Sequence, residues 1–327
     1  MSYPKLIRQD VYRNNASLQH TLRVTIITLA LFLFNVNAWG KDGHKIIADI
    51  AATKLEPKVL SAVIKILAVD GESTTMGDVS SWVDVVIHTD EYRWSAPLHF
   101  TNVRQKDCGN PYEGYNNCTY NYERDCVDRD GNNPGFCNVG AILNYTKRLQ
   151  YALKNGDHYV NETLDSLKFL IHFVGDISQP LHSGMLMDLG GLEMNVVYYV
   201  PDEGSNWSLH NVWDFGLITN KEGIEVKTKG IHTEITKRMD SYWKDEVLSW
   251  SKITDPNKWA QDSLNQAMTK AYRFANGTQI PKTSDHGAAS VIPQSYYDAY
   301  MCEGCAVELQ LAKGAIRLST LLNSLNW

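Results

Sequence analysis

The chain lacks an excess of positive charge: its 327 residues include 31 Lys and Arg against 37 Asp and Glu, a formal net charge of −6. A protein that wraps duplex nucleic acid usually carries a basic face that displaces counterions, and a polybasic membrane-surface protein needs a similar excess. The composition argues against both classes. Any nucleic acid that this chain binds would therefore be held locally, at one phosphate and a base or two.

Linkers, repeats and alternating strand patterns are also scarce. No long Gly/Ser or Pro run and no block of like charge interrupts the chain, and residues 196–200 are the one short strand candidate. Apolar residues instead recur at helical spacing over residues 45–67, with a break at Pro57, over 162–177 and over 307–325. The sequence predicts an all-α fold, one mostly helical domain at residues 39–327 with one or two minor strands.

The N-terminal apolar stretch, residues 24–34, falls short of the roughly 20 residues that span a bilayer. Basic residues precede it, and Val36 and Ala38 fit the positions before a signal-peptidase cut. We predict that residues 1–38 are a signal peptide and that Trp39 becomes the first residue; an uncleaved signal anchor is the alternative. The predicted location is extracellular, as a secreted protein, or vesicular, in the endomembrane lumen.

Six cysteines in an exported chain indicate disulfides. Four cluster in the long loop over residues 102–138, namely Cys108, Cys118, Cys126 and Cys137. Cys302 and Cys305 form a late pair, for which a Cys-x-x-Cys zinc site is the alternative. Five sequons predict glycosylation in a eukaryotic host, at Asn117, Asn144, Asn161, Asn206 and Asn276.

Histidine and aspartate form a pattern that suits a metal site. His172 and Asp176 are four residues apart, as are His210 and Asp214, so each pair shares one helix face and could hold one ion. A histidine on an apolar helix is more often a core residue, but that interpretation explains poorly the His182 that follows in Gln-Pro-Leu-His. Neighbouring zinc ions activate water and stabilise the entering and leaving oxygens of phosphate transfer.

Further motifs accompany this pattern along the chain: Trp39-Gly40, Gly43-His44, Ser81 to Asp84, Trp94-Ser95, Leu98 to Phe100, Tyr122 to Cys126, Asn144 to Thr146, His172 to His182, Leu209 to Asp214, His286 to Ala289 and Glu308 to Gly314. With these motifs the chain from Trp39 onward resembles the zinc-dependent class I nucleases of fungi, plants and protozoa. This group comprises single-strand-specific nucleases and 3'-nucleotidases. Bacterial phospholipases C share their three-zinc arrangement.

The resemblance implies a disulfide-stapled helical fold with a cleft that holds three Zn²⁺. One ion would be held by Asp84, His99, His172 and Asp176, a second by His182, His210 and Asp214, and a third by the free amino group and carbonyl of Trp39 with His44 and Asp176. Asp84 and Asp176 would act in catalysis. Signal cleavage would belong to the chemistry, because an acylated nitrogen is a poor metal donor.

The implied activity is that of a secreted endonuclease on single-stranded DNA or RNA that leaves 5'-phosphates, with 3'-nucleotidase activity. Single-stranded nucleic acid or a nucleotide would be its partner, and the chain would act as a monomer. Two alternatives stay open. One is a phospholipase C-like phosphoesterase on the same scaffold, and the other is a weakly active protein that binds zinc and nucleotide.

Departures from the family pattern surround the expected substrate site. Ile87 stands where relatives carry an Arg that neutralises phosphate, and Asn102 stands where they carry an Asp. The base-binding loop reads Gly190-Gly191-Leu192, with Leu192 in place of Asn. Removal of one charge-assisted donor typically costs a hundred- to thousandfold in rate, about 2.7–4 kcal/mol. We therefore expect an intact metal shell beside an altered substrate shell.

The resemblance also bears on the disulfides. Met268 stands where fungal relatives place the cysteine that pairs with the position of Cys118. Cys108 would then pair with Cys118, which leaves Cys126 to pair with Cys137. Cys302 and Cys305 would close on each other.

Overall fold

The computed structural model describes residues 39–69, 71, 75–104, 118–128, 130–157, 160–200, 204–219, 224–282, 289–303 and 305–327. Residues 1–38, Cys108, Asn117, the motif at His286 and the side chain of Cys302 lie outside this description. The predictions for the signal peptide and for these cysteines and this sequon therefore stay predictions. Within the described ranges, no helix is both long enough and apolar enough to cross a membrane.

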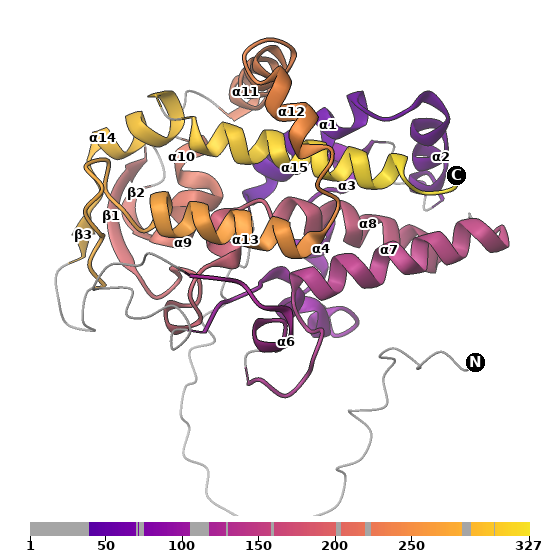
Figure 1. Cartoon of the computed structure of the whole chain (residues 1–327), viewed down its shortest axis with the longest axis horizontal. Helices are drawn as coiled ribbons and strands as arrows, with labels where there is room; N and C mark the ends of the chain where they lie inside the picture. The colour runs from indigo at the N-terminus through magenta and orange to yellow at the C-terminus, as the bar shows by residue number, and fades with distance from the viewer. Residues whose placement is uncertain are drawn as a thin grey trace, which may run out of the picture. The chain divides into compact units, whose positions relative to one another are not determined.

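Helices dominate the domain, as the apolar spacing predicts (Figure 1). The first half contains α1 Gly40–Thr53, α2 Pro57–Leu67, α3 Met76–Val79, α4 Trp82–Val86, η1 Arg93–His99, α6 Tyr122–Asp125, α7 Asn138–Asn155, α8 Asn161–Asp176, η2 Pro180–Ser183 and η3 Leu186–Asp188. The second half contains α9 Leu209–Asn211, η4 Val212–Gly216, α10 Leu217–Thr219, α11 Ile224–Asp240, α12 Lys244–Trp250, α13 Pro256–Gln266, η5 Ala267–Ala271, α14 Gln294–Tyr297, η6 Asp298–Glu303 and α15 Ala306–Asn323.

Two helices form the centre of the domain. Every residue of α8 from Ser166 to Asp176 is buried, and so is every residue of α15 from Gln310 to Ser319. Helix α8 packs against α7, and α15 packs against α1. Burial on all sides means that each polar residue on α8 needs a partner inside the protein.

Sequence signals explain where these helices begin and end. Pro57 is the first residue of α2, which is the position where a missing backbone N–H has no cost, so the predicted break at Pro57 is confirmed. Pro180 begins the short η2 directly after α8. Helix α7 ends at Gly156, whose φ of 77° is a left-handed conformation that favours glycine.

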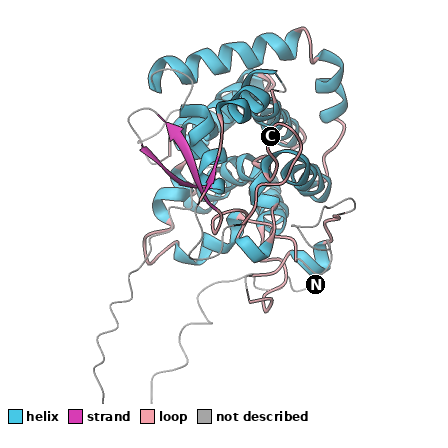
Figure 2. Cartoon of the chain, turned by 90° about the vertical axis from the view of Figure 1, so that its left-hand side faces the viewer, coloured by secondary structure: helices cyan, strands magenta, loops and turns pink. Residues whose placement is uncertain are grey.

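A three-stranded sheet lies at one side of the helices (Figure 2). Its strand order is β2-β1-β3. Strand β1, Asn195–Val200, confirms the predicted strand; β2 is Gly204–Ser208 and β3 is Ser290–Val291. Strand β2 pairs antiparallel with β1, whereas β3 pairs parallel to it. Strand β2 runs directly into α9, so the sheet positions the segment that carries His210.

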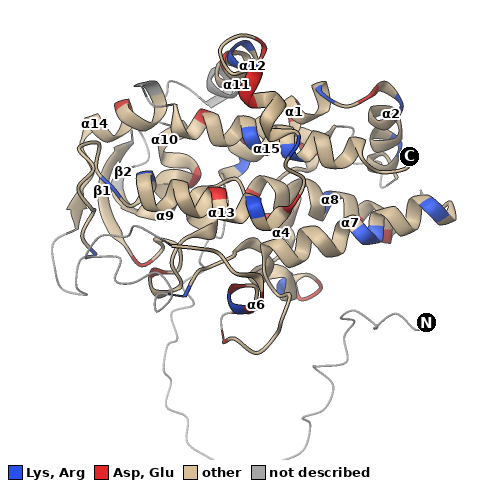
Figure 3. Cartoon of the chain, in the orientation of Figure 1, with Lys and Arg blue, Asp and Glu red and all other residues tan. Residues whose placement is uncertain are grey.

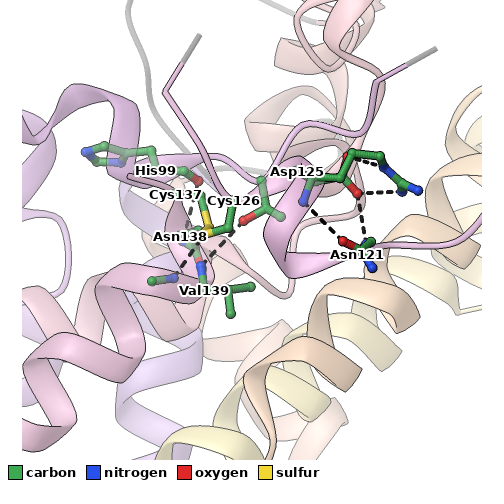
Figure 4. Close-up of a disulfide and its surroundings, with 10 residues drawn as sticks. His99, Asn121, Asp125, Cys126, Cys137, Asn138 and Val139 are labelled. Atoms are coloured by element: carbon green, nitrogen blue, oxygen red, sulfur yellow. Dashed lines mark hydrogen bonds and ion pairs between the residues drawn. A yellow bond between two sulfur atoms is a disulfide. The ribbon is translucent and has the colours of Figure 1, made fainter. Parts of the chain in front are cut away.

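The cysteine loop contains the short helix α6 and the predicted disulfide between Cys126 and Cys137 (Figure 4). This bond ties the end of α6 to the start of α7. Cys118 is disulfide-bonded as well, and its carbonyl accepts a hydrogen bond from Gln261 of α13, at 3.2 Å. Disulfides therefore hold this loop, as predicted, and the loop also contains the short helix α6, which the sequence did not predict.

Candidate metal centre

Three groups of histidine and aspartate meet in the interior of the domain. Within each group one ligand atom per residue lies within 4.8 Å of the others: His44 with His172 and Asp176; Asp84 with His99 and His172; and His182 with His210 and Asp214. Their side chains come from α1, α4, η1, α8, η2, α9 and η4. Every one of them is buried, His99, His172, Asp176 and Asp214 completely.

The first two groups share His172 and form one cluster around Asp176. Oδ1 of Asp176 lies 3.1 Å from Nε2 of His44, and its Oδ2 lies 3.0 Å from Nδ1 of His99. Nε2 of His172 lies 3.3 Å from Oδ1 of Asp84 and 3.4 Å from Oδ1 of Asp176. The His44 ring stacks on the His172 ring with centroids 4.1 Å apart. Asp176 thus lies between His44 on one side and His99 on the other, so its two oxygens could each contact an ion.

The third group contains a contact that two neutral imidazoles cannot make alone. Nδ1 of His182 lies 2.7 Å from the carbonyl of His99, and Nδ1 of His210 lies 2.7 Å from the carbonyl of Gly190. A carbonyl can only accept, so each Nδ1 carries the proton. Both Nε2 atoms then present lone pairs to each other across 3.2 Å. A cation that binds both nitrogens would resolve this repulsion.

The donor set also leaves buried polar atoms without a hydrogen bond. These are Nε2 of His44, Oδ1 of Asp84, Nε2 of His99, both carboxylate oxygens of Asp176 and Oδ2 of Asp214. An unpartnered buried polar atom is costly, and here most of them face the shared centres. Imidazole nitrogen with carboxylate oxygen is the donor set that zinc prefers, so these residues fit zinc.

Burial keeps most of these histidines neutral. Burial, and then neighbouring histidines, lower the pKa of His44 to about 4 and of His99 to about 3. Burial lowers the pKa of His210 to about 4 and takes that of His182 well below its usual range. Neutral imidazole is the form that binds metal.

His172 is the exception. Burial opposes its positive charge, but Asp176 and Asp84 outweigh burial and raise the pKa of His172 to about 9. Its Nδ1 donates to the carbonyl of Ser80 at 2.7 Å, so the proton on Nε2 occupies the position that a cation would take between the carboxylates. Metal binding at this cluster is therefore expected to release a proton.

Trp39 reaches the centre from the start of α1. Its side chain is completely buried, and its indole donates to Oγ of Ser178 at 3.1 Å. Its backbone N–H donates to the carboxylate of Asp214, and its φ of 45° is a left-handed conformation that is strained for a non-glycine residue. The first residue of the predicted mature chain is thus fixed beside Asp214.

Of the expected substrate residues, Asn102 lies close to the loop at Gly190, whereas Ile87 does not belong to this region. Asn102 lies between two backbone hydrogen bonds, Thr101 N–H to the His182 carbonyl at 2.7 Å and Val103 N–H to the Gly184 carbonyl at 2.9 Å. Its Oδ1 is buried without a partner, and a Cβ on Gly190 would lie 3.5 Å from it. The structure therefore brings Asn102 together with the glycine loop, which is the expected base-binding loop Gly190-Gly191-Leu192.

Ile87 and the residues of the glycine loop have different surroundings. Gly191 donates to Asp188 at 2.8 Å, and its own carbonyl accepts from the backbone of His210. Leu192, the next residue, is half-buried. Ile87, at the end of α4, belongs to the apolar core and is 5% exposed. The loop thus contacts the third group, whereas Ile87 is a core residue.

Three residues that matter to the centre were missed in the sequence. Gly175 gives His44 its room, because a Cβ on it would lie 2.5 Å from Nδ1 of His44. Asn138, next to Cys137, donates to the carbonyls of His99 at 3.4 Å and Phe173 at 3.1 Å (Figure 4). Gln179 donates to Asp214 at 2.6 Å. Gly175 and Gln179 belong to the motif from His172 to His182, so a signal existed for these two.

Charge outside the centre is mixed. Figure 3 shows Lys and Arg scattered among Asp and Glu over the described helices rather than gathered in a band. The ion pairs of Asp84, Asp176 and Asp214 within the described residues are all with histidine. Among the described residues, these three carboxylates are therefore not neutralised by Lys or Arg.

Comparisons with known proteins agree with the site. The family model described as S1/P1 Nuclease matches residues 39–326. Endonuclease 4 of Arabidopsis thaliana is 32% identical over 91% of this chain and 92% of its own length. Nuclease P1 of Penicillium citrinum is 28% identical over 88% and 98%, and Nuclease S1 of Aspergillus oryzae is 29% identical over 74% and 79%. The resemblance seen in the motifs is confirmed: the chain belongs to the S1/P1 nuclease family and is a hydrolase of phosphodiester bonds.

Proposed function

We propose that this chain is an exported, zinc-dependent endonuclease that cleaves single-stranded DNA or RNA to 5'-phosphates and also acts as a 3'-nucleotidase. One observation carries the proposal. In a chain of this family, His182 and His210 use their Nδ1 protons on backbone carbonyls and bring two Nε2 lone pairs within 3.2 Å of each other. Such a pair is stable when a cation lies between the nitrogens.

Three Zn²⁺ would be held by the nine predicted ligands: Trp39, His44, Asp84, His99, His172, Asp176, His182, His210 and Asp214. When bound, the ions lower the pKa of water and stabilise the oxygens of the reacting phosphate. The chain itself supplies the orientation. The carbonyls of Ser80, His99 and Gly190 fix three imidazoles in one tautomer each.

None of the four expected substrate residues, Ile87, Asn102, Gly191 and Leu192, is cationic. Asn102 offers an uncharged amide beside the glycine loop, where a family Asp would bear a charge. Gly191 has no side chain to block the approach of a base, and Leu192 would provide an apolar wall. Ile87 contributes packing in place of a charge-assisted phosphate contact.

Maturation would complete the site. Cleavage after Ala38 converts the amide nitrogen of Trp39, which lies beside Asp214, into an amine that can bind metal. Export also makes glycosylation possible at the exposed asparagines of three sequons, Asn161, Asn206 and Asn276, whereas Asn144 is half-buried inside α7. The mature enzyme would act as a monomer.

A direct assay tests this function. Purified mature protein is incubated with single-stranded DNA, RNA, a 3'-mononucleotide and phosphatidylcholine, with and without a chelator. Release of 5'-nucleotides that the chelator abolishes is the expected result. Release of lipid headgroup would favour the phospholipase alternative, and no reaction with any of the four would favour a zinc-binding protein without catalysis.

A further inference from the structure

Gln179, which is not a predicted ligand, contacts Asp214 of the third group. Asp214 is completely buried in the π-helical turn η4, and its two oxygens have different surroundings. Oδ1 accepts a hydrogen bond of 2.6 Å from Nε2 of Gln179, and the carboxylate also accepts one from the backbone N–H of Trp39. Oδ2 has no hydrogen-bond donor and lies 3.3 Å from Nε2 of His210. Oδ1 is thus held by the protein and lies 3.8 Å from Nε2 of His182, whereas Oδ2 lies next to His210 and accepts no hydrogen bond.

Gln179 is held in turn, so its amide cannot flip. Its Oε1 accepts from the backbone N–H of Leu181 at 2.5 Å, which requires the oxygen on that side and leaves the NH₂ group for Asp214. Its backbone N–H donates to the carbonyl of Asp176, and its own carbonyl accepts from His182. The Gln179 side chain is completely buried, and the next residue is Pro180, whose ring fixes its own φ.

The same segment therefore connects both parts of the centre. Asp176 and His182 are contacted by the backbone of Gln179, and Asp214 by its side chain. An amide is suited to this position because it donates to a carboxylate without adding charge. A cationic side chain would neutralise Asp214 and weaken it as a ligand, and a carboxylate would repel it.

From this geometry we propose that Gln179 is a positioning residue that directs Oδ2 of Asp214 toward the ion held by His182 and His210, and so sets the affinity of that ion alone. The inference rests on the proposed three-zinc site. Loss of an outer hydrogen bond to a metal ligand typically lowers metal affinity by about 10- to 100-fold. The ions around Asp176 keep all of their side-chain ligands.

The test uses two variants at this position and one matched control. Gln179→Met keeps the length but removes both hydrogen bonds, whereas Gln179→Glu keeps the acceptor for Leu181 and, when ionised, removes the donor to Asp214. Gln310→Met is the control: Gln310 is an equally buried amide that donates to the backbone carbonyl of Ser178 at 2.9 Å and to no predicted ligand. Zinc per chain is measured after dialysis against a series of chelator concentrations.

We expect wild type and Gln310→Met to retain three ions at a chelator concentration at which Gln179→Met retains two, because the third ion of that variant is bound about 10- to 100-fold more weakly. Gln179→Glu loses the same ion once its carboxyl group is ionised. Excess zinc restores activity in those variants, which a packing defect would not allow. Three firmly held ions in Gln179→Met, or equal loss in Gln310→Met, would overturn the inference. Fewer than three ions in wild type would instead contradict the proposed function.

Discussion

The change Gly175→Ala is predicted to disable the centre with the addition of a single methyl group. Gly175 lies in α8 next to Asp176, and a Cβ there would lie 2.5 Å from Nδ1 and 2.8 Å from Cε1 of His44, where ordinary contact is 3.4 Å or more. The His44 ring cannot retreat freely, because it stacks on His172 at 4.1 Å. The ring must therefore move by about 1 Å, a displacement that can cost about 100-fold in rate.

Fold stability separates this effect from general damage. Alanine is preferred over glycine inside a helix by about 1 kcal/mol, so Gly175→Ala has a compensating gain that a disruptive core mutation lacks. Gly230→Ala in α11 is the matched control, since nothing lies within 4 Å of its added Cβ. Zinc per chain, nuclease rate and urea unfolding are measured for both variants.

We expect Gly175→Ala to lose at least one zinc ion and about 100-fold in rate while it remains folded. We expect Gly230→Ala to keep three ions and full activity. Wild-type zinc content and rate in Gly175→Ala would refute the role assigned to His44.

Three other predictions follow from the same structure. Burial raises the pKa of Asp188 to about 6, so the folded protein binds this proton more tightly than the unfolded chain does. As pH rises from about 4 to about 6, the unfolding free energy of wild type should therefore fall by about 3 kcal/mol relative to that of Asp188→Asn. Urea unfolding measures both, and parallel pH profiles would contradict the prediction. Replacement of Cys126 and Cys137 by Ser opens a loop with a sequence separation of 11 and should cost about 3 kcal/mol of unfolding free energy; an unchanged urea midpoint would rule this out. A chain that retains Ala38 before Trp39 should bind less zinc and lose activity, and full metal content with full turnover would show that no free amine is needed.

The parts of the centre that depend on residues close together in the chain could be predicted from the sequence. His172 and Asp176 lie on one face of α8 because the helical period brings residues four apart together, and Pro57 and Pro180 mark real boundaries. His210 and Asp214 are also four apart, but η4, where Asp214 lies, is a π-helical turn, a form often found at functional sites that has no simple sequence period. The spacing predicted the pair correctly and its helix type only approximately.

The features that the sequence could not predict are mostly contacts of backbone atoms and contacts that arise only from tertiary packing. The carbonyls of Ser80, His99 and Gly190 orient three imidazoles, and every residue has a carbonyl, so no residue type marks that role. Strand β3 has only two residues and pairs with β1 across a long separation in sequence, too short for an alternating pattern. The clash that excludes a side chain at Gly175 arises only when α1 packs against α8.

The central claim is that the buried histidines and aspartates form a trinuclear zinc site next to a freed Trp39. Diffraction data collected from crystals of the mature protein at the zinc absorption edge would test it most directly. We expect three anomalous peaks: one between His182, His210 and Asp214, and two on either side of Asp176, one of them at the amino group of Trp39. A density map with no anomalous peak between the Nε2 atoms of His182 and His210 would contradict it.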